Sequence, residues 1–90
     1  MIKISFHNVD HSNALSHFLM SKTQKLQKFL GNKIEAFWVI DSDGKEFRPH
    51  LNILTRGKTI SLHSKATNAF VASSEILAKA KNLLSKKKFS

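Results

Sequence analysis

The chain has 90 residues, a length that suits one domain with a modest hydrophobic core and leaves no room for a second domain. Fifteen Lys and Arg against six Asp and Glu give a net charge of +9, which points to nucleic acid first and an anionic membrane surface second. The sequence has no Cys, which excludes disulfides and thiolate zinc sites, and no apolar run approaches the roughly 18 residues of a membrane span. We therefore expect a folded, soluble, cytoplasmic protein.

The first third of the chain predicts a strand followed by a long helix. Apolar and polar side chains alternate over residues 2–7, as in a half-buried strand. Residues 12–31 then place apolar side chains at three- and four-residue spacings, with Ser12 or Asp10 as the N-cap and Gly31 as the stop. This spacing predicts a helix of about five turns.

Two β-hairpins are predicted next. Residues 34–41 are rich in aromatic and β-branched side chains, an Asp-Gly turn signal follows, and residues 47–54 and 59–66 alternate around a tight turn at residues 55–58. Pro49 has no N–H to donate, so we expect it near the start of its strand or at a sheet edge. The alternation also allows His50 and His63 to be neighbours across paired strands, on a polar sheet face.

The last segment predicts a second helix, capped by Asn68. Its expected apolar face comprises Phe70, Ala72, Ile76, Leu77, Ala80, Leu83 and Leu84. The resulting order is β-α-β-β-β-α, which predicts an α+β fold: a four-stranded, mainly antiparallel sheet with both helices on one face, since that arrangement buries all the apolar faces together. The other sheet face would then carry Lys3, Ser5, His7, Arg48, His50, Ser61, His63 and Lys65.

Lysines concentrate in two acid-free stretches, one over the first predicted helix and the residues just after it, the other in the second predicted helix. The first stretch contains Lys22, Lys25, Lys28 and Lys33, and the second contains Lys79, Lys81, Lys86, Lys87 and Lys88. If the helices pack side by side and run parallel, their C-terminal halves meet and the two groups merge into one basic patch, which suits a phosphate backbone. Taken singly, such lysines are usually only solvated, and the last residues also fit a frayed tail. The convergence of both groups favours a binding surface.

Two sets of residues, one in each half of the chain, have an order and spacing typical of a known protein family. In the first half they comprise His7, Asn8, Val9, Ala14, Leu15, Phe18, Lys22, Lys25, Leu26, Lys28 and Phe29. In the second half they comprise Ala66, Asn68, Phe70, Ala72, Lys79, Leu84 and Lys86. Together these residues resemble the ribosome hibernation promoting factor family, which includes ribosome-associated inhibitor A. The chain departs from that pattern at Ser73 and Ser74, where the family usually has Ile-Asp, and at Asn68, where an acid is common.

The resemblance implies the same β-α-β-β-β-α fold and a specific partner. Family members bind the small ribosomal subunit between its head and body, over the sites for messenger and transfer RNA, and hold idle ribosomes inactive under stress. Residues 1–90 would form a single ribosome-binding domain with a basic C-terminal helix end at residues 79–88, without the C-terminal dimerisation domain of long members, and monomeric away from the ribosome. The residues implied to contact ribosomal RNA are Lys22, Lys25, Lys28, Lys79, Lys86 and Lys87, with Arg56 and Lys58 as weaker candidates at a hairpin tip.

Other function classes fit the sequence less well. There is no Cys nucleophile, no Gly-rich phosphate loop and no paired carboxylates outside a turn, so we expect neither catalysis, nor a cofactor, nor a small-molecule substrate. His7 and His11, with Asp10 between them, span a strand end and a helix entry, so we expect no metal site. The main rival is a general double-stranded or structured RNA-binding module. A third alternative is binding to a membrane or a protein partner through the basic helix.

Overall fold

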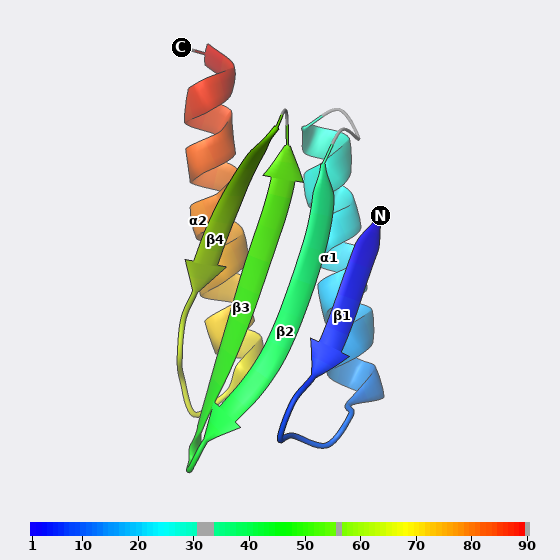
Figure 1. Cartoon of the computed structure of the whole chain (residues 1–90), viewed down its shortest axis with the longest axis vertical. Coiled ribbons are helices and arrows are strands. Elements are labelled where there is room, and N and C mark those ends of the chain that lie inside the picture. Colours follow the sequence, from blue (N-terminus) through cyan, green and yellow to red (C-terminus); the bar gives the residue numbers. More distant parts are fainter. Residues whose placement is uncertain (31–33, 56, 90) are drawn as a thin grey trace.

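The structure, a computed structural model, describes residues 1–30, 34–55 and 57–89, and side chains only as far as residue 84 in the last helix. The predicted order β-α-β-β-β-α is confirmed (Figure 1). Its elements are β1 (Ile2–Phe6), α1 (Asn13–Phe29), β2 (Glu35–Asp43), β3 (Glu46–Thr55), β4 (Lys58–His63) and α2 (Ala69–Phe89). The stop predicted at Gly31 lies outside the described residues.

The strands form one four-stranded sheet in the order β1-β2-β3-β4. β1 pairs with β2 in parallel, whereas β2 with β3 and β3 with β4 are antiparallel, so the predicted mainly antiparallel sheet is confirmed. Both helices cover the same face of the sheet and run side by side in the same direction, so their C-terminal ends lie at one end of the molecule (Figure 1). This arrangement leaves the other sheet face open.

Side-chain caps begin both helices. The Ser12 hydroxyl accepts a hydrogen bond from the backbone N–H of Leu15 at 3.2 Å, which identifies Ser12, and not Asp10, as the N-cap of α1. The Asn68 side-chain oxygen accepts from the N–H groups of Phe70 and Val71 at 2.8 and 3.2 Å. These oxygens satisfy donors that a helix N-terminus otherwise leaves unpaired, so both capping predictions are confirmed.

The hydrophobic core lies between the sheet and the two helices. Trp38, Ile40, Leu51 and Ile53 project from the central strands and are at most 1% exposed. The helices cover them with buried residues that include Leu15, Leu19 and Leu26 of α1 and Ala72, Ile76, Ala80 and Leu84 of α2. No helix within the described residues combines the length and apolarity that a bilayer span requires.

The predicted apolar face of α2 is wrong at two positions. Phe70 and Leu83 are 38% and 42% exposed, although their spacing predicts core positions. The buried side of α2 instead contains the small residues Ala69, Ala72, Ser73 and Ala80, all at most 8% exposed. Small side chains let α2 lie close to the sheet. With this side of the helix turned inward, Phe70 and Leu83 point outward.

The hairpins follow the predicted turn chemistry. Gly44 opens the two-residue loop between β2 and β3 with a φ of +64°, the left-handed conformation that tight hairpins require and that glycine adopts without strain. Pro49 lies near the start of β3, as predicted. Its carbonyl accepts from the N–H of Ser64, so its missing donor faces the segment just beyond β4, between the end of the β3–β4 ladder and the isolated bridge of Phe47 with Ala66.

Candidate nucleic-acid interface

A groove of about 290 Å³ opens between the C-terminal half of α1 and the middle of α2. We call it the inter-helix groove, and its lining residues are Lys22, Lys25, Leu26, Phe29, Leu77 and Lys81. Leu26 is buried, Leu77 is half-buried and Phe29 is 43% exposed, so these three side chains form an apolar floor that solvent reaches. The three lysines are exposed around this floor.

The rotation of α1 about its axis explains why its lysines line the groove. Thr23 and Leu26 are buried against the sheet, and the indole N–H of Trp38 donates to the Thr23 hydroxyl at 3.0 Å. Residues three and four apart lie on the same side of a helix. Lys22 and Lys25 therefore lie together, and both line the groove on the side of α1 that faces Leu77 and Lys81 of α2.

Aromatic rings in the seam between the helices hold two of the lysine ammonium groups. The Lys22 ammonium lies 5.8 Å from the centre of the Phe18 ring, and the Lys81 ammonium lies 5.2 Å from the centre of the Phe29 ring. Phe18 in turn packs edge-on against Phe70 at 5.2 Å. Exposed cation–π contacts of this kind contribute about 0.5–1 kcal/mol, enough to bias these long side chains towards the seam between the helices.

Carboxylates are scarce around this groove. The sequence of α1 contains no Asp or Glu, and the sequence of α2 contains one, Glu75. Its carboxylate accepts a hydrogen bond from the Ser64 hydroxyl at 2.7 Å, on the flank of α2 that faces the end of β4. Among the described residues, therefore, no acid lines the groove to offset the charge of Lys22, Lys25 and Lys81.

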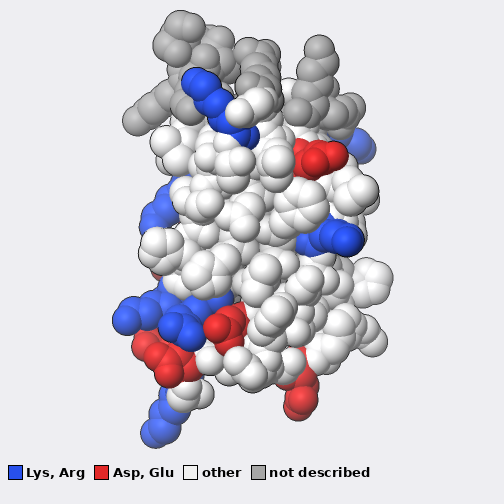
Figure 2. Space-filling model, in the orientation of Figure 1, with Lys and Arg blue, Asp and Glu red and all other residues white. Residues whose placement is uncertain are grey.

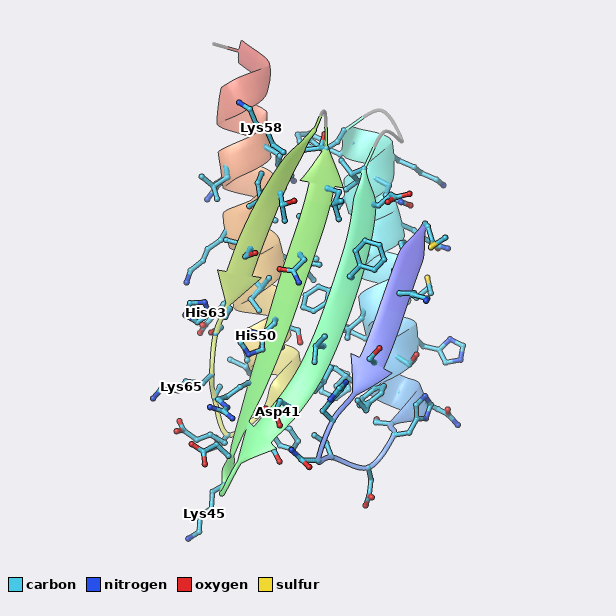
Figure 3. All side chains as sticks on the ribbon, viewed as in Figure 1. Asp41, Lys45, His50, Lys58, His63 and Lys65 are labelled. Atoms are coloured by element: carbon cyan, nitrogen blue, oxygen red, sulfur yellow. The ribbon has the colours of Figure 1, made fainter. Side chains whose placement is uncertain are left out.

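The structure brings together only part of the predicted contact set. Lys22 and Lys25 line the groove, whereas Lys28 is exposed outside it. Lys79 follows Glu75 by one helical turn, so it lies on the β4 flank of α2. Lys58 is exposed at the start of β4, at the end of the molecule where the helices end (Figure 3). Arg56 and the side chains of Lys86 and Lys87 lie outside the described residues.

Lys81 is the groove residue that the predicted contact set omits. It belongs to the second acid-free lysine group, but only its position relative to Leu77 reveals that it faces α1. Because Lys81 follows Leu77 by four residues, both project from the same side of α2. Among the described side chains, Lys81 is thus the member of the second lysine group that meets Lys22 and Lys25 of the first.

The open sheet face has a different chemistry. Uncharged side chains cover most of it, and positive and negative side chains meet at its lower end (Figure 2). The predicted polar positions are confirmed, and His50 pairs with His63 across β3 and β4 with their rings stacked 5.9 Å apart (Figure 3). The Arg48 guanidinium donates to the Asp41 carboxylate at 3.2 Å. This face offers mixed charge in place of a continuous basic surface.

Asp41 ties this face to the loop after β1. Its carboxylate accepts from the backbone N–H of Ser42 at 2.7 Å, and that hydrogen bond, with those from Asn8 and Arg48, holds the pKa of the Asp41 carboxyl below its ordinary value of 3.8. The Ser42 hydroxyl also donates to the Asn8 carbonyl at 3.1 Å. These bonds fix the chain between β1 and α1.

The histidines near this loop do not gather into a metal-binding cluster. The His11 ring packs edge-on against Phe6 at 4.8 Å. Across residues 1–30, 34–55 and 57–89, no three His, Asp or Glu side chains lie close enough together to hold a metal ion.

Comparison with known families identifies the family of this chain. The sequence pattern of the family described as Sigma 54 modulation protein / S30EA ribosomal protein matches residues 2–89. The chain belongs to this family. The resemblance noted from its motifs is therefore confirmed, and membership of the S30EA family makes it a ribosome-associated protein. No curated protein sequence matches the chain.

Two solved structures share the S30EA-family fold seen here. A ribosomal subunit interface protein from Coxiella burnetii superposes with a TM-score of 0.88 at 20% identity, covering 99% of this chain and 98% of the other. The N-terminal domain of protein Y from Thermus thermophilus gives a TM-score of 0.83 at 16% identity, covering 98% and 96%. At these identities the likeness establishes the fold alone.

Proposed function

We propose that this protein is a ribosome hibernation factor that binds ribosomal RNA of the small subunit in the channel for messenger and transfer RNA. By occupying that channel under stress or in stationary phase, it inhibits translation. The observation that carries this proposal is the inter-helix groove, in which Lys22, Lys25 and Lys81 converge and no acid is found among the described lining residues. Family membership and the structural similarity to a protein named for the ribosomal subunit interface support it.

The chemistry of the groove suits this role. Lysine ammonium groups hold phosphate as flexible point charges but read base edges poorly, so they serve a surface whose specificity comes from the shape of a folded RNA. Occlusion needs no reacting group, and the proposed mechanism is steric. The surrounding contacts proposed are those of Lys28, Lys58, Lys79, Lys86, Lys87 and Arg56. The protein would act in the cytoplasm and be monomeric away from the ribosome.

Co-sedimentation with purified small subunits and whole ribosomes tests this proposal. The proposal expects saturable binding that survives physiological salt and is competed by messenger RNA with initiator transfer RNA. Binding that disappears at physiological salt, or that ignores both competitors, contradicts it.

A general RNA-binding module is the second candidate. It is favoured by the fact that the polar rim of the groove consists of lysines, which hold phosphate without reading sequence. This alternative expects a long RNA duplex to bind as tightly as assembled small subunits. The hibernation proposal expects a strong preference for subunits, so titrating labelled duplex against subunits in the same buffer separates the two.

A further inference from the structure

We propose that the inter-helix groove receives an unpaired nucleobase, which lies on the Phe29 ring while lysines hold the adjoining phosphates. This inference rests on the proposed function and deepens it, because it specifies which state of RNA the groove selects. It predicts that the protein prefers a single-stranded or looped segment over a duplex. Lysine contacts by themselves give no such preference.

The lining of the inter-helix groove complements both parts of a nucleotide, the base and the phosphate. A nucleotide combines a flat, largely apolar base with a phosphate, and proteins that bind single strands pair aromatic platforms with basic rims for that reason. Here Leu26, Phe29 and Leu77 form the floor of the groove. Lys22, Lys25 and Lys81 surround that floor, and none of the lining residues that the structure describes is an acid that would repel a phosphate.

The contact between Lys81 and the Phe29 ring can be exchanged when RNA binds. In the free protein the Lys81 ammonium lies 5.2 Å from the ring centre. Lysine is flexible, and a phosphate attracts its ammonium more strongly than an exposed ring does. The ammonium can therefore move to the phosphate, and the ring, 43% exposed, can then stack on the base.

The position of the groove along the helices indicates that side chains, and not backbone N–H groups, bind the phosphates. A helix binds anions through free N–H groups at its N-terminus, whereas its C-terminus presents carbonyls. The groove lies between the C-terminal half of α1 and the middle of α2, well away from the N-terminal donors of either helix. We therefore assign the phosphates to the lysines and the base to the solvent-reached part of the apolar floor, where Phe29 is 43% exposed.

An RNA duplex cannot use the floor in this way. Its bases are stacked and paired inside, and its deep, narrow major groove does not admit side chains. A duplex reaches only the lysines at the rim. The groove thus distinguishes paired from unpaired RNA by whether a base can leave its stack.

Fluorescence anisotropy at low salt, where phosphate contacts are strongest, tests the inference with three labelled probes. The probes are a short oligouridylate, the same sugar-phosphate chain without bases, and a short RNA duplex. The inference expects the oligouridylate to bind roughly fivefold or more tightly than the abasic chain, the lower end of what a stacked base contributes. Equal affinities, or no measurable oligouridylate binding, overturn it.

Variants show whether Phe29 is the platform. Phe29→Leu keeps an apolar floor but removes the aromatic face, so it should abolish the preference for bases and leave the salt dependence unchanged. Phe37→Leu, on the open sheet face, is the matched control and should keep the preference. Thermal unfolding of both variants verifies that they fold. A base preference that survives Phe29→Leu, or is lost equally in Phe37→Leu, contradicts the assignment.

Two further measurements separate this inference from the proposed function. If small subunits bind with competition by messenger and transfer RNA but the base preference is absent, the inference fails and the proposed function stands. If subunits do not bind, the proposed function fails, whatever the oligonucleotides do. Base-independent binding combined with equal binding to vesicles of phosphatidylglycerol overturns the inference in favour of a general anionic surface.

Discussion

The indole N–H of Trp38 on β2 donates to the hydroxyl of Thr23 on α1 at 3.0 Å, and both side chains are at most 1% exposed. This bond joins the sheet to the helix that carries Lys22 and Lys25. A helix packed only through apolar contacts can rotate slightly with little cost, whereas a buried polar pair fixes one rotation because any other leaves donor and acceptor unpaired. The bond thereby orients the α1 side of the groove.

Thr23→Val should destabilise the protein by about 1–3 kcal/mol. The substitution keeps the shape of the side chain but leaves the Trp38 N–H buried without an acceptor. Urea unfolding measures the change in the free energy of unfolding. Thr59→Val, at an exposed site on β4, is the matched control and should change stability by less than about 0.5 kcal/mol. Equal losses in the two variants would show that the buried bond has no special weight.

Ser73→Ala should stabilise the protein. The Ser73 hydroxyl is fully buried and has no hydrogen-bond partner within the described residues. An unpaired buried hydroxyl costs about 1–3 kcal/mol, part of which its removal recovers, and alanine also has the higher helix propensity.

The exposed neighbour Ser74 isolates the contribution of that hydroxyl. Ser74→Ala changes helix propensity alone, so the Ser73→Ala gain should exceed it by about 1 kcal/mol. Thermal and urea unfolding measure both. If the two gains are equal, the Ser73 hydroxyl is satisfied in solution, and its departure from the family pattern costs no stability.

Asp41 should make stability depend on pH in the acid range. Hydrogen bonds from the Ser42 backbone, the Asn8 side chain and Arg48 lower the folded-state pKa of Asp41 from its ordinary 3.8. A carboxyl with a depressed folded pKa stabilises the fold above its unfolded pKa, and this contribution is lost as pH falls through the folded pKa. Stability should therefore decline as pH falls below about 3.8.

Asp41→Asn should flatten this part of the pH profile. Urea midpoints measured from neutral pH downward should decline less steeply in Asp41→Asn than in the parent protein. Asp43→Asn, which changes an exposed carboxyl two residues further along, is the control and should keep the parent profile. Identical profiles for all three proteins would exclude Asp41 as a source of the acid dependence.

Replacing the three groove lysines should weaken RNA binding in a salt-dependent way. Each phosphate contact contributes about 0.7–0.9 to the slope of log affinity against log salt. The combined change Lys22→Gln, Lys25→Gln and Lys81→Gln should therefore reduce that slope by about two units and weaken small-subunit binding strongly. Sedimentation over a series of salt concentrations measures both.

A charge-matched variant separates the groove from net charge. Lys3→Gln, Lys45→Gln and Lys65→Gln remove the same charge at exposed positions away from the groove. This variant should retain most of the affinity and slope. If both triple variants lose affinity equally, the total charge of the protein and not the groove governs binding.

Much of the fold was predictable because its signals are local. A period of two marks the strands and a spacing of three and four marks the helices, and each pattern is visible within a short stretch of sequence. The caps Ser12 and Asn68 and the turn at Gly44 act on the backbone within a few residues of their own positions. Once the order β-α-β-β-β-α is read, burial of the apolar faces places both helices on one side of the sheet.

The sequence by itself determined the elements, their layers and the presence of two acid-free lysine groups, because these depend on local pattern and composition. Only the tertiary structure decided which lysines face each other. Residues two apart on a helix point about 160° apart, so the rotation of α2 about its axis determines that Lys81 faces α1 while Lys79 points away from it. That rotation depends on how Ala72, Ser73 and Ala80 pack against the sheet. Such packing involves residues distant in sequence, and no local pattern specifies it.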